Sequence, residues 1–310
     1  MTFTHLHVHS HYSLLEAIWS PKALIAQAKA LDMEAISLTD YAGMYGAVEF
    51  YKEVKKQDIK PIIGVELGYV QDMHYKDPQE NAGTIVLLAR NYEGYQNLMQ
   101  IVSQAQLEGF HKIPRIDQQC LQNFKEGIIT LSWGPNSRLG KLLIAQQATD
   151  QVNEQLVQLM ELFGKKDCYL SRIVQDKPGG NIQEVNKQML SLAETHQIDL
   201  VCSGDTHYIY ANDLQTFEIA LAIKDSKRIY DTDRRHADGK RHLQSEEEIR
   251  KRLKKSWLEE ERIEEMIKKN NEIADSIDIQ IPMGTALFPV YESPAEITEL
   301  YGKRKEKLVV

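Results

Sequence analysis

The chain has 310 residues, of which 42% are hydrophobic and 26% are charged, as in an ordinary globular protein of one large or two smaller domains. A net charge of −8 argues against a chain that binds nucleic acid over its whole surface. Three scattered cysteines form no C-x-x-C pair, which excludes a disulfide framework and favours a reducing cytoplasm. No apolar run approaches the roughly 20 residues of a membrane span, and no signal-peptide pattern opens the sequence.

Histidines are concentrated at the start of the chain, in the sequence HLHVHSH of residues 5–11. His5, His7 and His9 are spaced by two, so on a β-strand their imidazoles share one face. Neutral imidazole is a common metal ligand, whereas a histidine-rich surface strand is the plainer interpretation. The pattern therefore indicates a metal site if acidic and histidine residues from distant segments return to the same place.

Apolar runs and amphipathic helices alternate after this segment. Ser20 followed by Pro21 predicts a helix start, with serine as the N-cap and proline at the first helical position. We expect strands at residues 5–9, 35–39, 61–65, 84–89, 127–131, 168–173 and 199–202. Such βα alternation predicts a parallel sheet with helices outside it. Seven or eight units in about 200 residues favour a closed barrel over an open sheet.

Residues that can bind metal stand where four of these strands are expected to end. In chain order they are His7, His9, Asp40, Glu66, Asp205 and His207. The carboxyl ends of the strands of a parallel barrel meet at one edge, where the chemistry of such proteins collects. The sequence therefore predicts a converging metal site at this edge.

The sequence changes character beyond residue 210. Residues 213–222 are expected to be helical, 230–240 to form a charged, mobile loop, and 246–276 to be a highly charged helical region. A basic cluster in this last region is flanked by acidic residues, so an ion-paired helix face is favoured over a nucleic-acid site. We divide the chain into a barrel at 1–210, a helical part at 211–285 and a linker at 286–310.

Four motifs resemble those of the PHP (polymerase and histidinol phosphatase) family. They are His5–Ser10, Leu38–Asp40, Pro61–Glu66 and Gly204–Tyr208. Further stretches are similar to the PHP domain of bacterial DNA polymerase III alpha subunits of the DnaE type. They are Gly46–Tyr51, Leu88–Leu98 and Glu126–Thr130. The resemblance covers about residues 1–290 and implies an α/β fold, the distorted (β/α)7 TIM-like barrel of the PHP superfamily.

The same resemblance implies a site for up to three divalent ions with nine ligands, which in some members cleaves phosphoesters, including 3′-terminal nucleotides. It assigns ligand roles to His7, His9, Glu66, Asp205 and His207. Glu16 stands where the family has an aspartate and is a further candidate. Three other ligand positions differ: Tyr41 replaces a histidine, no histidine stands near Thr84, and no cysteine or histidine stands in the stretch that ends at Gly134.

This pattern leaves one complete set of ligands for a metal ion, beside sets in which ligands have been replaced. His7, His9, Glu66 and Asp205 can together hold one ion through nitrogen and oxygen ligands, which suits zinc or manganese. Tyr41 is a poor ligand at neutral pH because its phenol stays protonated. Phosphoester cleavage in multi-metal sites uses neighbouring ions to clamp the attacking and leaving oxygens. We therefore expect at most one ion, and a degenerate site that is weakly active or inactive.

Three nearby residues have other interpretations. His5 is expected to be a hydrogen-bonded histidine of the core rather than a ligand. His11 is either a substitute ligand or a surface residue, and the sequence does not separate the two. Asp40 is expected to orient a neighbour or to cap the following helix rather than to bind metal directly.

Two functions follow from these expectations. The first is a PHP domain that supports the core of a DNA polymerase III alpha subunit, a DNA-directed polymerase of replication. The alternative is an active metal-dependent 3′–5′ exonuclease or phosphoesterase similar to histidinol phosphatase, against which the replaced ligands argue. Nothing in the chain looks like a palm domain, so the Mg²⁺ ions of polymerisation would belong to the absent core. The expected partner is the remainder of the polymerase chain, with DNA contacted through it, in the cytoplasm and away from membranes.

Overall fold

The computed structural model describes residues 2–77, 82–145, 149–174, 181–237, 240–256 and 258–284. The chain divides into two units, Met1–Ile279 and Gln280–Val310. The described part of the second unit is 280–284, so the linker expected at 286–310 lies outside the described residues. The boundary expected at residue 210 stays a prediction.

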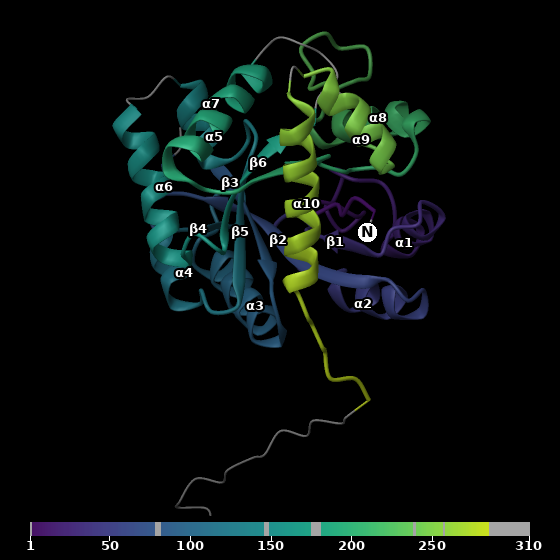
Figure 1. Ribbon diagram of the computed structural model, residues 1–310, viewed down its shortest axis with the longest axis horizontal. Coiled ribbons are helices and arrows are strands. Elements are labelled where there is room, and N and C mark those ends of the chain that lie inside the picture. Colours follow the sequence, from purple (N-terminus) through teal and green to yellow (C-terminus); the bar gives the residue numbers. More distant parts are fainter. Residues whose placement is uncertain are drawn as a thin grey trace, which may run out of the picture. The chain divides into compact units, whose positions relative to one another are not determined.

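A curved sheet forms the centre of the first unit, and helices lie around it (Figure 1). Its strands are β1 Ala35–Leu38, β2 Lys60–Tyr69, β3 Gly83–Ala89, β4 Arg115–Ile116, β5 Ile128–Trp133, β6 Cys168–Ile173 and β7 Leu200–Ser203. They follow the order β1-β2-β3-β5-β6-β7, and the short β4 pairs with β2. Most strand residues are buried, as expected for apolar runs in a sheet that helices cover. The chain is an α/β protein with a distorted, TIM-like (β/α)7 barrel, which confirms the expected fold class.

One strand runs against the predicted direction. β3 is antiparallel to both β2 and β5, whereas the pairs β1–β2, β5–β6 and β6–β7 are parallel, so the prediction of an all-parallel sheet is wrong here. Parallel neighbours need a crossover, usually a helix, and the described residues between Tyr69 and Gly83 contain no helix. As a result Thr84, near the start of β3, pairs with Gly68 near the end of β2. β2 also extends beyond the predicted end at residue 65, so Glu66 lies inside the strand.

Residues 5–9, which we call the seam segment, close the barrel between β1 and the residues that follow β7. The segment forms an isolated bridge, Val8 with Thr206, in place of the regular strand expected there. On one side the amide of Thr39 donates to the Val8 carbonyl at 2.8 Å. On the other side the amide of His9 donates to the Thr206 carbonyl at 2.8 Å. The seam segment therefore joins the two ends of the curved sheet.

The helices lie close to where the sequence predicts them. They are α1 Pro21–Ala30, α2 Ala47–Lys56, α3 Tyr92–Leu107, α4 Gln118–Asn123, α5 Arg138–Ile144, α6 Thr149–Phe163, α7 Asn181–His196, α8 Leu214–Lys224, α9 Glu246–Lys254 and α10 Glu260–Ser276. The Ser20 side chain accepts from the Ala23 amide and Pro21 is the first residue of α1, which confirms the predicted start. Within the described ranges, no helix is long and apolar enough to cross a membrane.

One buried side chain, Asn270 of α10, ties the start of the chain to β7. Its amide group donates to the carbonyls of Thr4 at 3.0 Å and Cys202 at 2.8 Å, and its oxygen accepts from the Cys202 amide at 3.0 Å. Asn270 is fully buried, so water does not reach these backbone groups at the contact. Asn270 therefore holds the seam of the barrel from outside.

Asn270→Leu should destabilise the protein strongly. Leucine is apolar and leaves three buried backbone groups without this partner, and one such unsatisfied group costs about 1–3 kcal/mol. We expect the free energy of unfolding in urea to fall by at least about 2 kcal/mol. The control is Lys268→Ala on the exposed face of the same helix, which should change stability by less than about 0.5 kcal/mol. A loss no larger than that of the control would contradict the assigned role.

Candidate metal centre

The fold brings five predicted ligands together from three segments. They are His7 and His9 of the seam segment, Glu66 of β2, and Asp205 and His207, which follow β7. Each of the five is at most 1% exposed, so the cluster is closed off from bulk water. Side chains distant in sequence thus meet at the seam of the barrel.

The donor atoms of His7, His9 and Glu66 form a first group. Glu66 Oε2 lies 2.7 Å from His7 Nε2 and 3.3 Å from His9 Nε2, and the two imidazole nitrogens are 3.0 Å apart. Donor atoms this close to one another could bind one metal ion together. Nitrogen and oxygen donors in this combination suit zinc or manganese.

The donor atoms of His9, Asp205 and His207 form a second group beside the first. Asp205 Oδ1 lies 2.8 Å from His207 Nε2 and 3.9 Å from His9 Nε2. Asp205 has a φ of +47°, a left-handed conformation that aspartate adopts more readily than most residues, and the chain turns there after β7. The guanidinium of Arg241 contacts both Asp205 and His207. The second group therefore already contains a cation of the protein itself.

A hydrogen-bond relay fixes the ring of His9. The Ser13 hydroxyl donates to Asp40 Oδ1 at 2.7 Å, so its oxygen is left to accept from His9 Nδ1 at 3.2 Å. His9 then carries its proton on Nδ1 and presents the lone pair of Nε2 to the cluster. Asp40 in turn accepts from the amide and the hydroxyl of Ser10, at 2.6 and 2.8 Å. Asp40 thus orients a neighbour, and it does not cap α2, whose N-cap is Gly46.

The charges of the cluster follow from its burial and from its neighbours. Burial lowers the pKa of His9 to about 4, so its imidazole is neutral and available as a ligand at neutral pH. Burial would raise the pKa of Glu66, but His7 and His9 outweigh it and bring that pKa to about 2. Burial acts in the same way on Asp205, but Arg241 and other neighbours hold its pKa well below the usual range. Both carboxylates are therefore ionised at neutral pH.

The first group fits a single divalent ion. Glu66 is ionised, and its second oxygen, Oε1, is buried with no hydrogen-bond partner among the described residues. A buried anionic oxygen in this state is costly unless a cation compensates it. His9 Nε2 lies 3.3 Å from the other oxygen of the same carboxylate, Oε2. The second group fits an ion less well because a guanidinium already contacts its donors.

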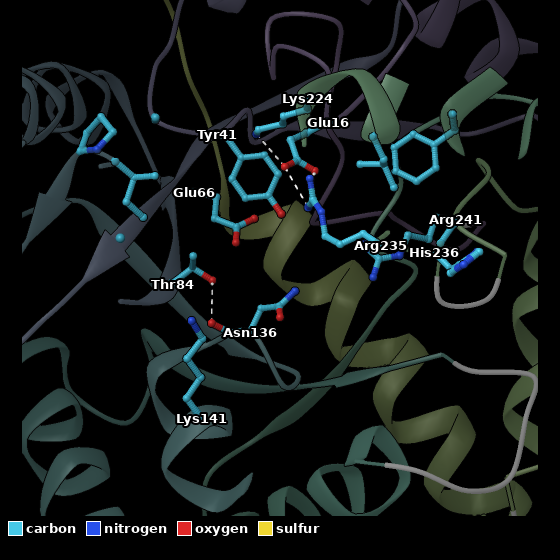
Figure 2. Close-up of a pocket in the computed structure, with 17 residues that line it drawn as sticks. Glu16, Tyr41, Glu66, Thr84, Asn136, Lys141, Lys224, Arg235, His236 and Arg241 are labelled. Carbon is cyan, nitrogen blue, oxygen red and sulfur yellow. Dashed lines mark hydrogen bonds and ion pairs between the residues drawn. The ribbon is translucent and has the colours of Figure 1, made fainter. Parts of the chain in front are cut away.

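Glu16 and Tyr41 lie outside both groups. The carboxylate of Glu16 forms ion pairs with Lys224 at 2.6 Å and Arg235 at 3.1 Å, and Figure 2 shows these three side chains together. Tyr41 stacks on the ring of His9, with centroids 4.3 Å apart and an interplanar angle of 15°. Burial and the nearby carboxylates raise the pKa of Tyr41 well above its usual value, so its phenol is protonated.

The other two replaced positions, Thr84 and Gly134, also lie outside both groups. The Thr84 hydroxyl donates to the Asn136 carbonyl at 3.3 Å. Gly134 has a φ of +46°, which favours glycine, and a Cβ there would lie 2.2 Å from the Ile173 side chain. A hydroxyl bonded to a carbonyl and a residue without a side chain do not replace a lost imidazole.

Two further histidines of the opening segment lie away from the donor groups. His5 is buried, and its Nε2 hydrogen-bonds the Gln244 carbonyl at 2.9 Å, which confirms the predicted core histidine. His11 is exposed and packs edge-on against Tyr12. The structure therefore places His11 on the surface rather than among the candidate ligands.

A cavity of about 430 Å³ lies beside the cluster, and Tyr41 and Glu66 line it (Figure 2). Thr84 and Asn136 lie on another part of its wall. Its basic lining residues are Lys141, Lys224, Arg235, His236 and Arg241. The cavity thus combines a candidate metal centre with side chains that attract anions.

The geometry defines a class of protein, an α/β barrel whose seam carries converging histidine and carboxylate side chains. The model of the PHP domain family matches residues 5–171, more than half of the chain. The chain belongs to the PHP domain family.

Comparison with curated proteins shows which members of this family the chain is similar to. The chain is similar to the DNA polymerase III subunit alpha of Borreliella burgdorferi, with 31% identity over 305 residues that cover 96% of this chain and 26% of that protein. It is similar to the same subunit of Treponema pallidum, with 32% identity over 96% of this chain and 25% of that protein. The chain thus spans about a quarter of the length of these relatives. A solved amidohydrolase from Chromobacterium violaceum matches with a TM-score of 0.44 and 12% identity, over 66% of this chain and 87% of that chain, a likeness too weak to support a function.

The sequence interpretation missed the basic residues that contact the candidate ligands, Lys224, Arg235 and Arg241. In the described part of the loop expected to be mobile at 230–240, residues 230–237 and 240, ion pairs anchor the chain, among them Arg234 with Glu218 at 2.9 Å. Arg241 is positioned by long-range pairing, since its carbonyl accepts from the His207 amide at 2.8 Å. No local pattern distinguishes Arg241 from the basic residues on either side of it.

Acid should destabilise the protein in part through His5. Burial lowers the pKa of His5 to about 4, whereas in an unfolded chain it is about 6.5. Between these values the unfolded chain binds the additional proton. The stability that neutral His5 supplies is therefore complete above pH 6.5 and is lost as the pH falls towards 4.

The variant His5→Gln isolates this effect, because glutamine keeps a donor for the Gln244 carbonyl but does not titrate. We expect the free energy of unfolding, measured in urea with EDTA present, to fall less steeply between pH 6.5 and 4 in this variant. The difference in slope should correspond to about one proton. Equal slopes for the variant and the wild type would contradict a neutral, buried His5.

Proposed function

We propose that the chain is the PHP domain of a DNA polymerase III alpha subunit and that it supports the polymerase core. The similarity to alpha subunits over 96% of the chain supports this proposal, together with the hydrogen-bonded seam of the barrel. A barrel with a large buried core can persist as a scaffold after the residues at its edge have changed. The loss of candidate ligands at Tyr41, Thr84 and Gly134 fits such a role.

The metal centre in this proposal holds one divalent ion, zinc or manganese. The observation that carries it is the group formed by His7, His9 and Glu66, with one buried carboxylate oxygen still without a hydrogen bond among the described residues. The ion would supply the positive charge that this carboxylate lacks. Ser13 orients the ring of His9, and Asp205 of the second group lies 3.8 Å from His7 Nδ1.

An ion in this group would be of limited use for phosphoester cleavage. Such cleavage benefits from two ions that clamp the attacking and the leaving oxygen. The donors for a second ion, Asp205 and His207, are in contact with Arg241, and Glu16 is paired with Lys224 and Arg235. We therefore propose a centre that mainly stabilises the seam.

The second candidate function is an active 3′–5′ exonuclease or phosphoesterase. One observation favours it: the cavity beside Glu66 has a basic wall, which includes Lys141 and Arg241 and could hold a phosphate group. The replaced ligands argue against it, as does the contact of Arg241 with Asp205 and His207 of the second donor group.

The proposal also concerns the longer protein of which this chain would be a domain. The activity of that protein would be that of a DNA-directed DNA polymerase, a nucleotidyltransferase of DNA replication in the cytoplasm. Its Mg²⁺ ions and its DNA would be bound by parts of the polymerase outside this chain, and those parts would be the partner of this domain. The net charge of −8 agrees with a domain that does not itself bind DNA over its surface.

Activity assays separate the two candidate functions. We expect no metal-dependent turnover of 3′-labelled single-stranded DNA or of p-nitrophenyl phosphate, with Mn²⁺ or Zn²⁺ added. The control is the double variant His7→Ala, His9→Ala, which should have a lower melting temperature than the wild type in the presence of zinc, because an ion bound to the native state stabilises it. Turnover that disappears in the double variant would establish the exonuclease or phosphoesterase instead.

Ser13→Ala should weaken zinc binding about 10- to 100-fold, the usual effect of removing the partner that orients a ligating histidine. Ser10→Ala is a matched control, because the Ser10 hydroxyl also donates to Asp40, whereas the ring of His9 bonds the hydroxyl of Ser13. We expect the control to bind zinc nearly as tightly as the wild type, in a competition titration against a chromophoric chelator. Equal losses in the two variants would show that the contact between Ser13 and His9 does not orient a ligand.

A further inference from the structure

We propose that the guanidinium of Arg241 is a resident cation of the metal centre. It takes the place of a second divalent ion at Asp205 and His207, and so limits the centre to one ion. This inference deepens the single-ion centre proposed above and rests on it. It assigns to Arg241 the role of a residue that determines metal occupancy.

The contacts of Arg241 are those that an ion at the second group would make. Its Nη1 lies 3.1 Å from His207 Nε2 and 2.8 Å from Asp205 Oδ2, the second contact being an ion pair rather than an aligned hydrogen bond. A guanidinium donates and never accepts, so the groups that it touches act as acceptors. The carboxylate of Asp205 therefore faces Arg241 as it would face a metal ion, and His207 Nε2 lies beside it.

His207 and Asp205 lie together against Arg241. The Nδ1 atom of His207 faces the carbonyl oxygen of Glu16, which can only accept, so Nδ1 carries a proton. Its Nε2 lies 2.8 Å from Asp205 Oδ1 and 3.1 Å from Arg241 Nη1. The positive charge of Arg241 therefore lies where a second ion would lie, and it compensates the ionised carboxylate of Asp205.

The backbone fixes Arg241 in this position. Its carbonyl accepts from the His207 amide at 2.8 Å, and its amide donates to the Tyr208 hydroxyl at 3.1 Å. The Leu243 amide donates to the Tyr208 carbonyl at 2.9 Å, which extends the pairing past the arginine. Arg241 is thus held by the same residues that follow β7 and carry the second donor group.

A second ion would have to displace this guanidinium. The Arg241 side chain is 18% exposed and its partner Asp205 is 1% exposed, so water screens the pair little. Loss of the arginine would leave a buried carboxylate uncompensated, and that carboxylate would then attract a divalent ion. Lys224 and Arg235 neutralise Glu16 in the same manner, again with cations of the protein.

The number of bound ions tests this inference. Arg241→Gln removes the charge and keeps a polar side chain, whereas Arg241→Lys keeps the charge. Arg262→Gln is a control for the loss of an arginine far from the centre, where it pairs with Glu265. Zinc per chain is measured by elemental analysis after gel filtration, and the melting temperature is measured with and without zinc.

We expect one zinc ion per chain in the wild type, in Arg241→Lys and in Arg262→Gln, and two zinc ions per chain in Arg241→Gln. Added zinc should raise the melting temperature of Arg241→Gln by more than it raises that of the wild type. Equal zinc in Arg241→Gln and the wild type would overturn the inference, as would two ions in the wild type. No zinc in the wild type and one ion in Arg241→Gln would refute the single-ion centre but support the role of Arg241.

A measurement on the unaltered side chain decides the question if Arg241→Gln does not fold. The guanidinium signals of Arg241 are identified by NMR as those missing from Arg241→Lys. Their protons should stay protected from solvent exchange after one equivalent of zinc has been added. Loss of that protection at the first equivalent would show that the ion displaces the guanidinium, and would overturn the inference.

Discussion

The backbone pairing of the seam segment is the constraint on which the rest of the structure depends. The segment pairs with Thr39 on the side of β1 and with Thr206 beyond β7, so it closes the curved sheet. Side chains alternate along an extended segment, and burial of Val8 on one face therefore turns His7 and His9 together to the other. The same backbone pairing thus closes the barrel and brings the donor side chains together. Asn270 of α10 secures that closure from outside.

Charge balance is the second constraint, because the carboxylates of Glu66 and Asp205 are buried and that of Glu16 is only partly exposed. Asp205 is compensated by Arg241, and Glu16 by Lys224 and Arg235. Glu66 faces two imidazoles and keeps one oxygen without a hydrogen bond among the described residues. A divalent metal ion at Glu66 would compensate the remaining negative charge of this carboxylate. A barrel that supplies most of its own cations can give up metal ions without leaving several buried charges uncompensated.

Much of the fold could be predicted from the sequence, because the apolar runs and the start of α1 at Ser20 and Pro21 are local signals. The meeting of Glu66 with the seam histidines was also predictable, since each carries a recognisable motif. The reversed direction of β3 was not, because local pattern does not report which neighbour a strand pairs with. Arg241 was missed for a related reason: its place depends on pairing with His207, far away in the sequence.

Anomalous diffraction from crystals grown with zinc tests the central claim most directly, because it locates each ion as well as counting it. The account predicts one peak per chain at full occupancy, within bonding distance of His7, His9 and Glu66, at roughly 2–2.3 Å from the donor atoms. It also predicts density for the Arg241 side chain, and no peak, between Asp205 and His207. Two or three fully occupied peaks, with Arg241 turned away, would contradict a barrel that has replaced ions with its own side chains.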